Sequence, residues 1–280
     1  MNSLSLYISQ SLQGHYSARE LKSLVRIICL DILKIDMIDF YSGKDIHLSE
    51  KDMQELKTIL HRLCANEPIQ YILGCVNFGG LSFDVAPGVL IPRPETEELV
   101  DLIVEQNPVP QRILDIGTGS GCIAISLNKK MPLSQISAWD VSEEALIIAR
   151  GNNRKHNTSV EFLNKDVFSD VSSFDRTYDI IVSNPPYITL SERKNIDDRV
   201  LKWEPEVALF VPDEDPLLYY RRIALIGRTL LSAGGQIYFE INQSYGAEVS
   251  SMLAALEYKN VSVLKDLYEN DRFIIASKEE

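Results

Sequence analysis

From residue 112 onward, short apolar runs alternate with segments whose apolar residues recur at helical spacing. The runs predict seven strands, near residues 112–116, 135–139, 160–163, 178–183, 236–241, 261–264 and 272–277. Strands separated by helices form a parallel sheet, whereas the last two runs lie too close together for a helical crossover and should pair antiparallel. The pattern therefore predicts an α/β domain over residues 89–280, built on a seven-stranded, Rossmann-like sheet with an antiparallel last strand.

Residues 1–74 follow a different pattern. A capping box at residues 17–20 precedes apolar residues at helical spacing, and Ser49 can cap another helix with a similar apolar stripe. Because both stripes need partners, residues 1–74 should form a small helical bundle. Alternating apolar and polar residues then predict a β-hairpin linker over residues 75–88. Residues 188–214 show no regular periodicity, which is typical of a lid or a substrate-docking loop.

The run at 178–183 leads directly into Asn184-Pro185-Pro186-Tyr187. Open α/β sheets bind ligands at the carboxyl ends of their strands. Prolines have no N–H and a fixed φ, so this segment presents the carbonyl oxygen of Pro185 beside the side-chain oxygen of Asn184. Two such acceptors suit a planar –NH₂ group, and the ring of Tyr187 could cover its flat face. The four residues are therefore predicted to be catalytic and to bind the substrate. The alternative is an ordinary turn with a half-buried ring.

A second motif joins the strand at 112–116 to a glycine-rich turn and a helix. Glycines let backbone approach a ligand, and the helix N-terminus adds N–H donors. No Gly-Lys-Ser/Thr follows, and the third glycine comes one residue too early for a dinucleotide fingerprint. The alternative is a tight strand-to-helix corner. As a ligand site, the motif supplies these candidate cofactor-binding residues: Asp115, Gly117, Thr118, Gly119, Ser120 and Gly121.

Two further acids follow predicted strands. Asp140 comes about 20 residues after the glycine turn, where a carboxylate commonly accepts hydrogen bonds from ribose hydroxyls; it could instead cap the next helix, as could Ser142. Asp166 could meet an adenine amino group, with Val167 and Phe168 against the ring, or it could be a solvated loop acid. Together the motifs describe a nucleoside-bearing ligand beside an –NH₂ acceptor, with no phosphate-binding lysine and no metal set. This combination fits S-adenosylmethionine better than NAD or ATP.

Composition narrows the choice of partners. The chain of 280 residues carries 40 acidic and 28 basic residues, and its net charge of −12 disfavours binding to a phosphate backbone. Its four cysteines form no C-x-x-C pair, which predicts reduced thiols, and its four histidines are scattered. No signal peptide or membrane-spanning stretch is evident, so a cytoplasmic protein without a membrane partner is expected.

Five stretches carry a resemblance to a known family. They read EPIQYILG at 67–74, LIPRPETE at 90–97, LDIGTGSG at 114–121, SNPPYI at 183–188 and WEP at 203–205. With them the chain resembles the HemK/PrmC-type family of peptide chain release factor glutamine methyltransferases. The resemblance implies a class I methyltransferase fold, S-adenosyl-L-methionine as cofactor with S-adenosyl-L-homocysteine as product, and release factors as protein substrates. It also implies that residues 1–74 recognise the substrate.

The reaction that the resemblance implies is methylation of the side-chain amide nitrogen (N5) of the GGQ-type glutamine. It implies that Arg93 borders the cofactor and the acceptor, although a surface charge is the alternative. Val167 stands where relatives often carry an aromatic ring against adenine, and Phe168 could substitute. Asn184 would then contact both the cofactor and the substrate.

Other functions remain open from the sequence. The same pocket could serve a DNA or RNA methyltransferase acting on an adenine or cytosine amino group. The acidic composition and the absence of a basic target-recognition segment disfavour this alternative. A non-catalytic nucleoside-binding module is a third possibility, which the intact Asn184–Tyr187 segment disfavours.

Overall fold

The computed structural model describes residues 2–172 and 174–279, and the chain divides into two compact units. The helical unit comprises Met1–Gly74 together with Asp197–Trp203, and the sheet unit comprises Cys75–Ile196 and Glu204–Glu280. The chain therefore leaves the sheet unit after Ile196, contributes one short helix to the helical unit and returns at Glu204.

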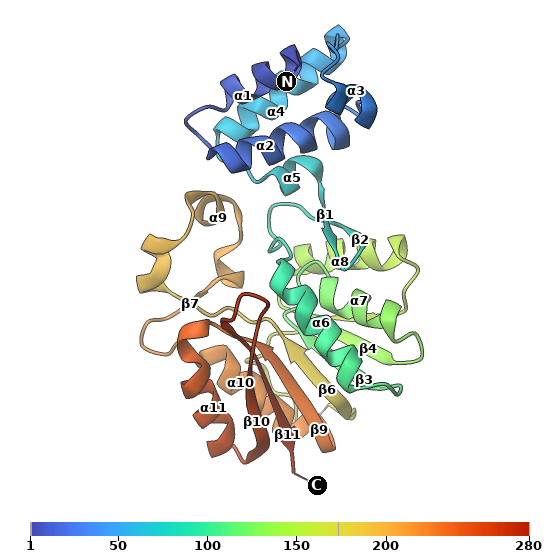
Figure 1. The fold of residues 1–280 in the computed structure, drawn as a ribbon. Coiled ribbons are helices and arrows are strands. Elements are labelled where there is room, and N and C mark those ends of the chain that lie inside the picture. The colour runs from blue at the N-terminus through green and yellow to red at the C-terminus, as the bar shows by residue number, and fades with distance from the viewer. Residues whose placement is uncertain (1, 173, 280) are drawn as a thin grey trace. The chain divides into compact units, whose positions relative to one another are not determined.

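The helical unit is a small bundle, as the apolar stripes predicted (Figure 1). Its elements are α1 (Ser3–Ser11), α2 (Ala18–Ile27) continued by the π-helix η1 (Ile28–Ile32), α3 (Met37–Ser42), α4 (Glu50–Cys64), α5 (Ile69–Leu73) and α9 (Asp198–Trp203). Ser17 begins α2 with the predicted capping box, in which its hydroxyl accepts from Glu20 N. Ile28, Leu56 and Leu63 are fully buried in the bundle core.

Helix α9 is attached to the bundle by polar contacts. Arg199 forms an ion pair with Glu20 at 2.8 Å, and its guanidinium lies 5.1 Å from the ring centre of Tyr16. Lys202 Nζ donates to the carbonyl oxygen of Ala65 at 3.0 Å.

The segment 188–214 was expected to be irregular, and this expectation was wrong because its elements are too short for periodicity to detect. They are β7 (Ile188–Thr189), η2 (Leu190–Asn195), α9, η3 (Glu206–Ala208) and β8 (Phe210–Val211).

The sheet unit is built on a seven-stranded sheet in the order β10-β11-β9-β6-β3-β4-β5. Its strands are β3 (Arg112–Ile116), β4 (Gln135–Asp140), β5 (Glu161–Asn164), β6 (Tyr178–Ser183), β9 (Leu231–Glu240), β10 (Tyr258–Lys265) and β11 (Asp271–Lys278). The pairs β3–β4, β3–β6, β4–β5 and β6–β9 are parallel, and β11 pairs antiparallel with both β9 and β10. The predicted sheet with its reversed last strand is therefore confirmed.

Helices cover both faces of this sheet and bury its apolar residues (Figure 1). They are α6 (Pro94–Gln106), α7 (Cys122–Lys130), α8 (Glu143–Lys155), α10 (Leu218–Leu230) and α11 (Gly246–Ala255). Ile180 packs with α6 and α7, whereas its neighbour Ile181 packs with α10 and α11 on the other face. Burial on both faces explains why the central strands read as continuous apolar runs.

The predicted hairpin forms from β1 (Cys75–Phe78) and β2 (Leu81–Asp84), and it belongs to the sheet unit. Phe78 and Phe83 meet edge to face, with ring centres 5.8 Å apart, and both are buried in the core below α6 and α7. Asn152 of α8 accepts from Asp84 N at 2.7 Å and donates to the carbonyl oxygen of Ser120 at 2.9 Å. The hairpin is thereby connected to the glycine-rich turn.

Candidate active site

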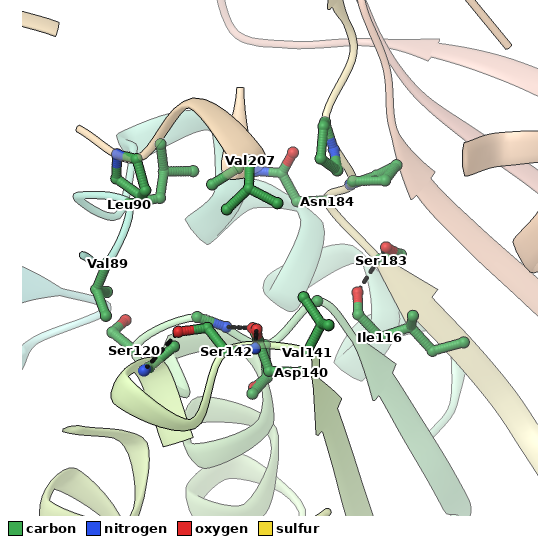
Figure 2. A pocket seen from close by; sticks show the side chains of 18 of the residues that line it. Val89, Leu90, Ile116, Ser120, Asp140, Val141, Ser142, Ser183, Asn184 and Val207 are labelled. Carbon is green, nitrogen blue, oxygen red and sulfur yellow. Dashed lines mark hydrogen bonds between the residues drawn. The ribbon is translucent and has the colours of Figure 1, made fainter. Parts of the chain in front are cut away.

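A cavity of about 320 Å³ lies at the carboxyl edge of the sheet, where β3, β4, β5 and β6 end. Its walls contain the following residues that the sequence singled out: Arg93, Gly117, Thr118, Gly119, Ser120, Asp140, Asp166, Val167, Phe168, Asn184, Pro185 and Pro186. Figure 2 shows Asn184 beside Val207, across the cavity from Ser120, Asp140 and Ser142. The structure therefore brings together residues from five separate stretches of the sequence.

The glycine-rich turn after β3 is held by backbone hydrogen bonds. Gly117 N and Thr118 N both donate to the carbonyl oxygen of Trp139, at 2.9 and 3.0 Å. Gly121 begins α7 with a φ of +82°, and a Cβ there would lie 2.9 Å from Ile125 Cδ1. Only glycine fits both the conformation and the space. Gly121 itself lies outside the cavity lining, so its place in the motif is explained by close packing of the turn.

Asp115 lies behind this turn rather than at the cavity wall. Its side chain is fully buried, and its Oδ2 accepts from Thr118 Oγ1 at 2.6 Å. Burial raises the pKa of the Asp115 carboxyl to about 7. In the structure, Asp115 orients Thr118, which lines the cavity.

The raised pKa of Asp115 predicts a pH-dependent stability. The ordinary pKa of this carboxyl is 3.8, so between about pH 4 and pH 7 the unfolded chain loses a proton that the folded chain keeps. The free energy of unfolding should therefore fall as pH rises through this window. Asp115→Asn has no such proton, so its melting temperature relative to wild type should rise by several degrees from pH 4.5 to pH 8. Thermal unfolding at several pH values measures this difference.

The matched control is Asp175→Asn, which changes an exposed carboxyl of the same unit. This variant should keep the wild-type pH dependence. A difference between Asp115→Asn and wild type that stays constant across the pH range would contradict the assignment of the proton to Asp115.

Asp140 ends β4 and faces the cavity (Figure 2). Its Oδ2 accepts from Gly119 N at 2.8 Å, and its Oδ1 accepts from Ser142 N at 2.9 Å. Ser142 is the residue that caps α8, because its hydroxyl accepts from Ala145 N at 3.1 Å. Burial raises the pKa of Asp140, while the backbone N–H donors oppose that shift. The carboxylate thus joins the glycine turn to the start of α8.

The segment after β5 forms another part of the wall. Val167 is half-buried, and its carbonyl oxygen accepts from Arg222 Nε at 2.6 Å. Phe168 is exposed and meets Tyr219 edge to face, with ring centres 5.4 Å apart. Asp166 Oδ1 accepts from Phe168 N at 2.8 Å. Both Val167 and Phe168 line the cavity, and Phe168 is the more exposed of the two.

Asn184 and Pro185 follow β6 and line the cavity. Asn184 Nδ2 donates to Thr96 Oγ1 at 3.2 Å, which leaves its Oδ1 to other partners. The preceding residue, Ser183, donates from Oγ to the carbonyl oxygen of Ile116 at 2.6 Å and thereby ties the ends of β6 and β3 together (Figure 2).

Tyr187 does not lie in the cavity lining, although the sequence placed its ring against the bound –NH₂ group. Its hydroxyl donates to Glu240 Oε1 at 3.2 Å, and its ring packs against the core on the α10 and α11 side of the sheet. Burial raises the pKa of the Tyr187 phenol well above its ordinary value, so it remains a hydrogen-bond donor.

The remaining wall joins two distant segments, residues 88–93 and 205–208. Arg93 forms an ion pair with Glu204 at 2.6 Å, and Glu204 Oε2 accepts from Ile91 N at 3.1 Å. The Glu204 side chain is 1% exposed, so the pair is desolvated on its acidic side. Arg93 is thus part of the cavity wall and also holds the two segments together.

Sequence reasoning missed several lining residues, among them Leu90, Thr96, Cys122, Ser142, Val207, Tyr219 and Ile223. Thr96 lies within the family stretch at residues 90–97, and this was the only feature of the sequence that could have indicated a place in the site. Burial raises the pKa of Cys122 to about 12, which keeps its sulfur a thiol and makes it a poor nucleophile.

Two kinds of feature are absent from residues 2–172 and 174–279, the part of the chain that the structure describes. No group of three or more His, Cys, Asp or Glu side chains in that part of the chain is placed to hold a metal ion. None of the helices described there is both long enough and apolar enough to cross a membrane.

Comparisons with known proteins agree with this architecture. Residues 4–74 match the PrmC N-terminal domain, and residues 95–205 match the methyltransferase small domain. A methyltransferase from Pyrococcus furiosus has the same fold, with a TM-score of 0.55 and 18% identity over 80% of this chain and 100% of that one. A T. thermophilus 16S rRNA methyltransferase, solved with AdoMet and guanosine, gives a TM-score of 0.54 at 18% identity over 73% of this chain and 50% of that one. The fold and the site define a class I methyltransferase.

Two full-length relatives identify the family. The release factor glutamine methyltransferase of Bacteroides thetaiotaomicron is 55% identical over 99% of this chain and 100% of that protein. The enzyme of the same name from Flavobacterium psychrophilum is 42% identical over 95% of this chain and 94% of that protein. The chain belongs to the release factor glutamine methyltransferase family.

Proposed function

We propose that this enzyme transfers a methyl group from S-adenosyl-L-methionine to the side-chain amide nitrogen (N5) of a glutamine in peptide chain release factors. The observation that carries the proposal is the 55% identity over the whole length of a relative named for this activity. Asn184 and Pro185 support it, because both line the cavity and both carry oxygens that an amide –NH₂ can use.

The cavity fits the proposed cofactor. Its volume of about 320 Å³ lies within the range of small-molecule sites. Asp140 supplies a carboxylate for the ribose hydroxyls, and the turn at Gly117–Ser120, which lines the cavity, lets the backbone approach the cofactor closely. Ile116 and Val167 offer apolar surface to the adenine, with Asp166 for its amino group and Phe168 at the outer edge. Asp115 would act on the cofactor through Thr118.

When bound, S-adenosyl-L-methionine supplies a methyl group on a positively charged sulfonium, which is an excellent leaving group. An amide nitrogen is a poor nucleophile because its lone pair is delocalised into the carbonyl. The main contribution of the protein is therefore alignment, which can lower a barrier by up to ~7–11 kcal/mol. Asn184 Oδ1 and the Pro185 carbonyl oxygen accept the two N–H bonds of the glutamine and fix the direction of its nitrogen.

The same two oxygens stabilise the positive charge that develops on the nitrogen. The methylated amide is strongly acidic and loses its proton to water, so no side chain has to act as a base. Pro186 makes the segment rigid. We further propose that residues 1–74 recognise the release factor, that residues 75–88 link the domains, and that residues 89–280 carry out the transfer, with Arg93 and Tyr187 holding the substrate pocket in shape.

Transfer of label from methyl-labelled S-adenosyl-L-methionine tests the substrate class. A purified release factor should become labelled, whereas duplex DNA should not, because a chain with a net charge of −12 repels its phosphates. Label on the DNA alone, or on neither acceptor, would overturn the proposed function.

A further inference from the structure

A chain of hydrogen bonds connects Asn184 to a buried acid. Asn184 Nδ2 donates to Thr96 Oγ1 at 3.2 Å, and Thr96 Oγ1 donates to Glu240 Oε2 at 2.6 Å. Tyr187 donates to the other oxygen, Glu240 Oε1, at 3.2 Å. Thr96 and Glu240 are 2% and 1% exposed, so water does not compete for these bonds. The other three members of this chain, Thr96, Glu240 and Tyr187, come from α6, β9 and the segment after β6.

The direction of this chain follows from the chemistry of its last member. Carboxyl oxygens accept hydrogen bonds, and in the structure the hydroxyls of Thr96 and Tyr187 each donate to one oxygen of Glu240. A threonine hydroxyl has a single hydrogen, and Thr96 uses it on Glu240. Its oxygen can therefore only accept, and the Asn184 amide must present Nδ2 to it. The two ends of a planar amide lie on opposite sides, so Oδ1 is turned away from Thr96.

Burial and the neighbouring groups act on the charge of Glu240 in opposite directions. Burial raises the pKa of Glu240, which favours the neutral acid. The hydrogen bond from Thr96, the positive charge of Arg272 and the hydrogen bond from Tyr187 act in the opposite direction. Arg272 is itself held by Asp266, whose Oδ2 accepts from its Nε at 3.1 Å.

We propose that Thr96 and Glu240 are positioning residues that fix which atom of the Asn184 amide faces the acceptor nitrogen. The proposal rests on the proposed function, in which that nitrogen carries two N–H donors. An amide rotated by half a turn would offer its own –NH₂ group to them, and two donors cannot bond to each other. Thr96 and Glu240 would thus select the productive orientation of Asn184 through the hydrogen bond that Thr96 accepts from its amide.

The test compares variants of Thr96. Thr96→Val keeps the shape of the side chain and removes its hydroxyl, so kcat for methylation of a release factor should fall by about 10²-fold. The Kd for S-adenosyl-L-methionine, measured by calorimetry, should stay within threefold. Thr96→Ser restores the hydroxyl and should recover most of the lost kcat. Thr229→Val, which removes an exposed hydroxyl from α10, is the matched control and should leave kcat unchanged.

A second readout follows the Asn184 amide directly. In protein labelled with ¹⁵N-asparagine, the side-chain signal of Asn184 is the one that disappears in Asn184→Ala. Its protons should be protected from exchange in wild type and in Thr96→Ser, and should lose that protection in Thr96→Val. Protection that is unchanged in Thr96→Val would overturn the inference.

Thermal unfolding of each variant checks that the substitution leaves the protein folded. If Thr96→Val does not fold, Thr96→Ala removes the same hydroxyl with less bulk and is judged by the same criteria. Absence of transfer by the wild type would refute the proposed function. If the wild type transfers the methyl group and both Thr96→Val and Thr96→Ala have the same kcat as the wild type, the positioning role alone is refuted.

Discussion

Asn184→Ala is expected to lower kcat for methyl transfer by about 10²–10³-fold, the usual effect of removing one preorganised group that stabilises developing charge. The variant removes Oδ1, which we place on the acceptor nitrogen, and it also ends the hydrogen bond to Thr96. The backbone carbonyl of Pro185 remains, so the pocket would keep one of its two acceptors. Steady-state kinetics with a release factor as substrate measures the loss.

The cofactor should still bind to this variant. The Kd for S-adenosyl-L-methionine is expected to remain within a few fold of wild type, because Asp140 and the glycine-rich turn are unchanged. Asn77→Ala, which changes an exposed asparagine of β1, is the matched control and should retain full activity. Wild-type turnover in Asn184→Ala would remove the basis of the mechanism.

Asp140→Ala should weaken cofactor binding, whereas Asn184→Ala lowers kcat. We expect a rise of about 10–10²-fold in the Kd of Asp140→Ala for S-adenosyl-L-methionine. The carboxylate accepts from Gly119 N and Ser142 N and faces the cavity. Its removal leaves two backbone donors without their partner and takes away the acceptor for the ribose hydroxyls, and hydrogen bonds to charged groups contribute about 1.5–3 kcal/mol each. Isothermal calorimetry checks the affinity.

The control for Asp140 is its neighbour on α8. Glu143→Ala removes an exposed carboxylate from the first turn of that helix and should leave the Kd within twofold. A variant Asp140→Ala that bound the cofactor normally and lost only kcat would show that the ribose assignment is mistaken.

The sheet was predictable because each central strand is buried on both faces. Ile180 and Ile181 point to opposite faces and are both buried, and such pairs make the run at 178–183 stand out from its flanks. The antiparallel end was predictable because residues 261–264 and 272–277 leave no room for a helix. The carboxyl edge then placed Gly117, Asp140 and Asn184 together, because parallel strands end on the same side.

The network behind the site was not predictable in the same way. Thr96 lies 88 residues from Asn184 and 144 residues from Glu240 along the chain, so no local pattern joins them. The position of Tyr187 depends on the same distant acid, which accepts its hydroxyl hydrogen away from the cavity. Asp115 was read as a ligand residue because its motif is contiguous, whereas the geometry of the turn places it behind Thr118.

The ion pair of Arg93 and Glu204 was hidden from the sequence for a related reason. Each residue stood in a family stretch, and only the folded chain shows that they meet across 111 positions. The short elements between residues 188 and 214 were missed because a two-residue strand or a single turn of helix leaves no periodic signal.

A crystal structure with S-adenosyl-L-homocysteine and a release-factor peptide containing the target glutamine would test the central claim most directly. We predict that Asn184 Oδ1 and the Pro185 carbonyl oxygen each lie within about 2.7–3.2 Å of the glutamine amide nitrogen, on the side away from the sulfur. A complex in which either oxygen faces solvent, or in which the glutamine nitrogen lies elsewhere than beside the sulfur, would contradict this account.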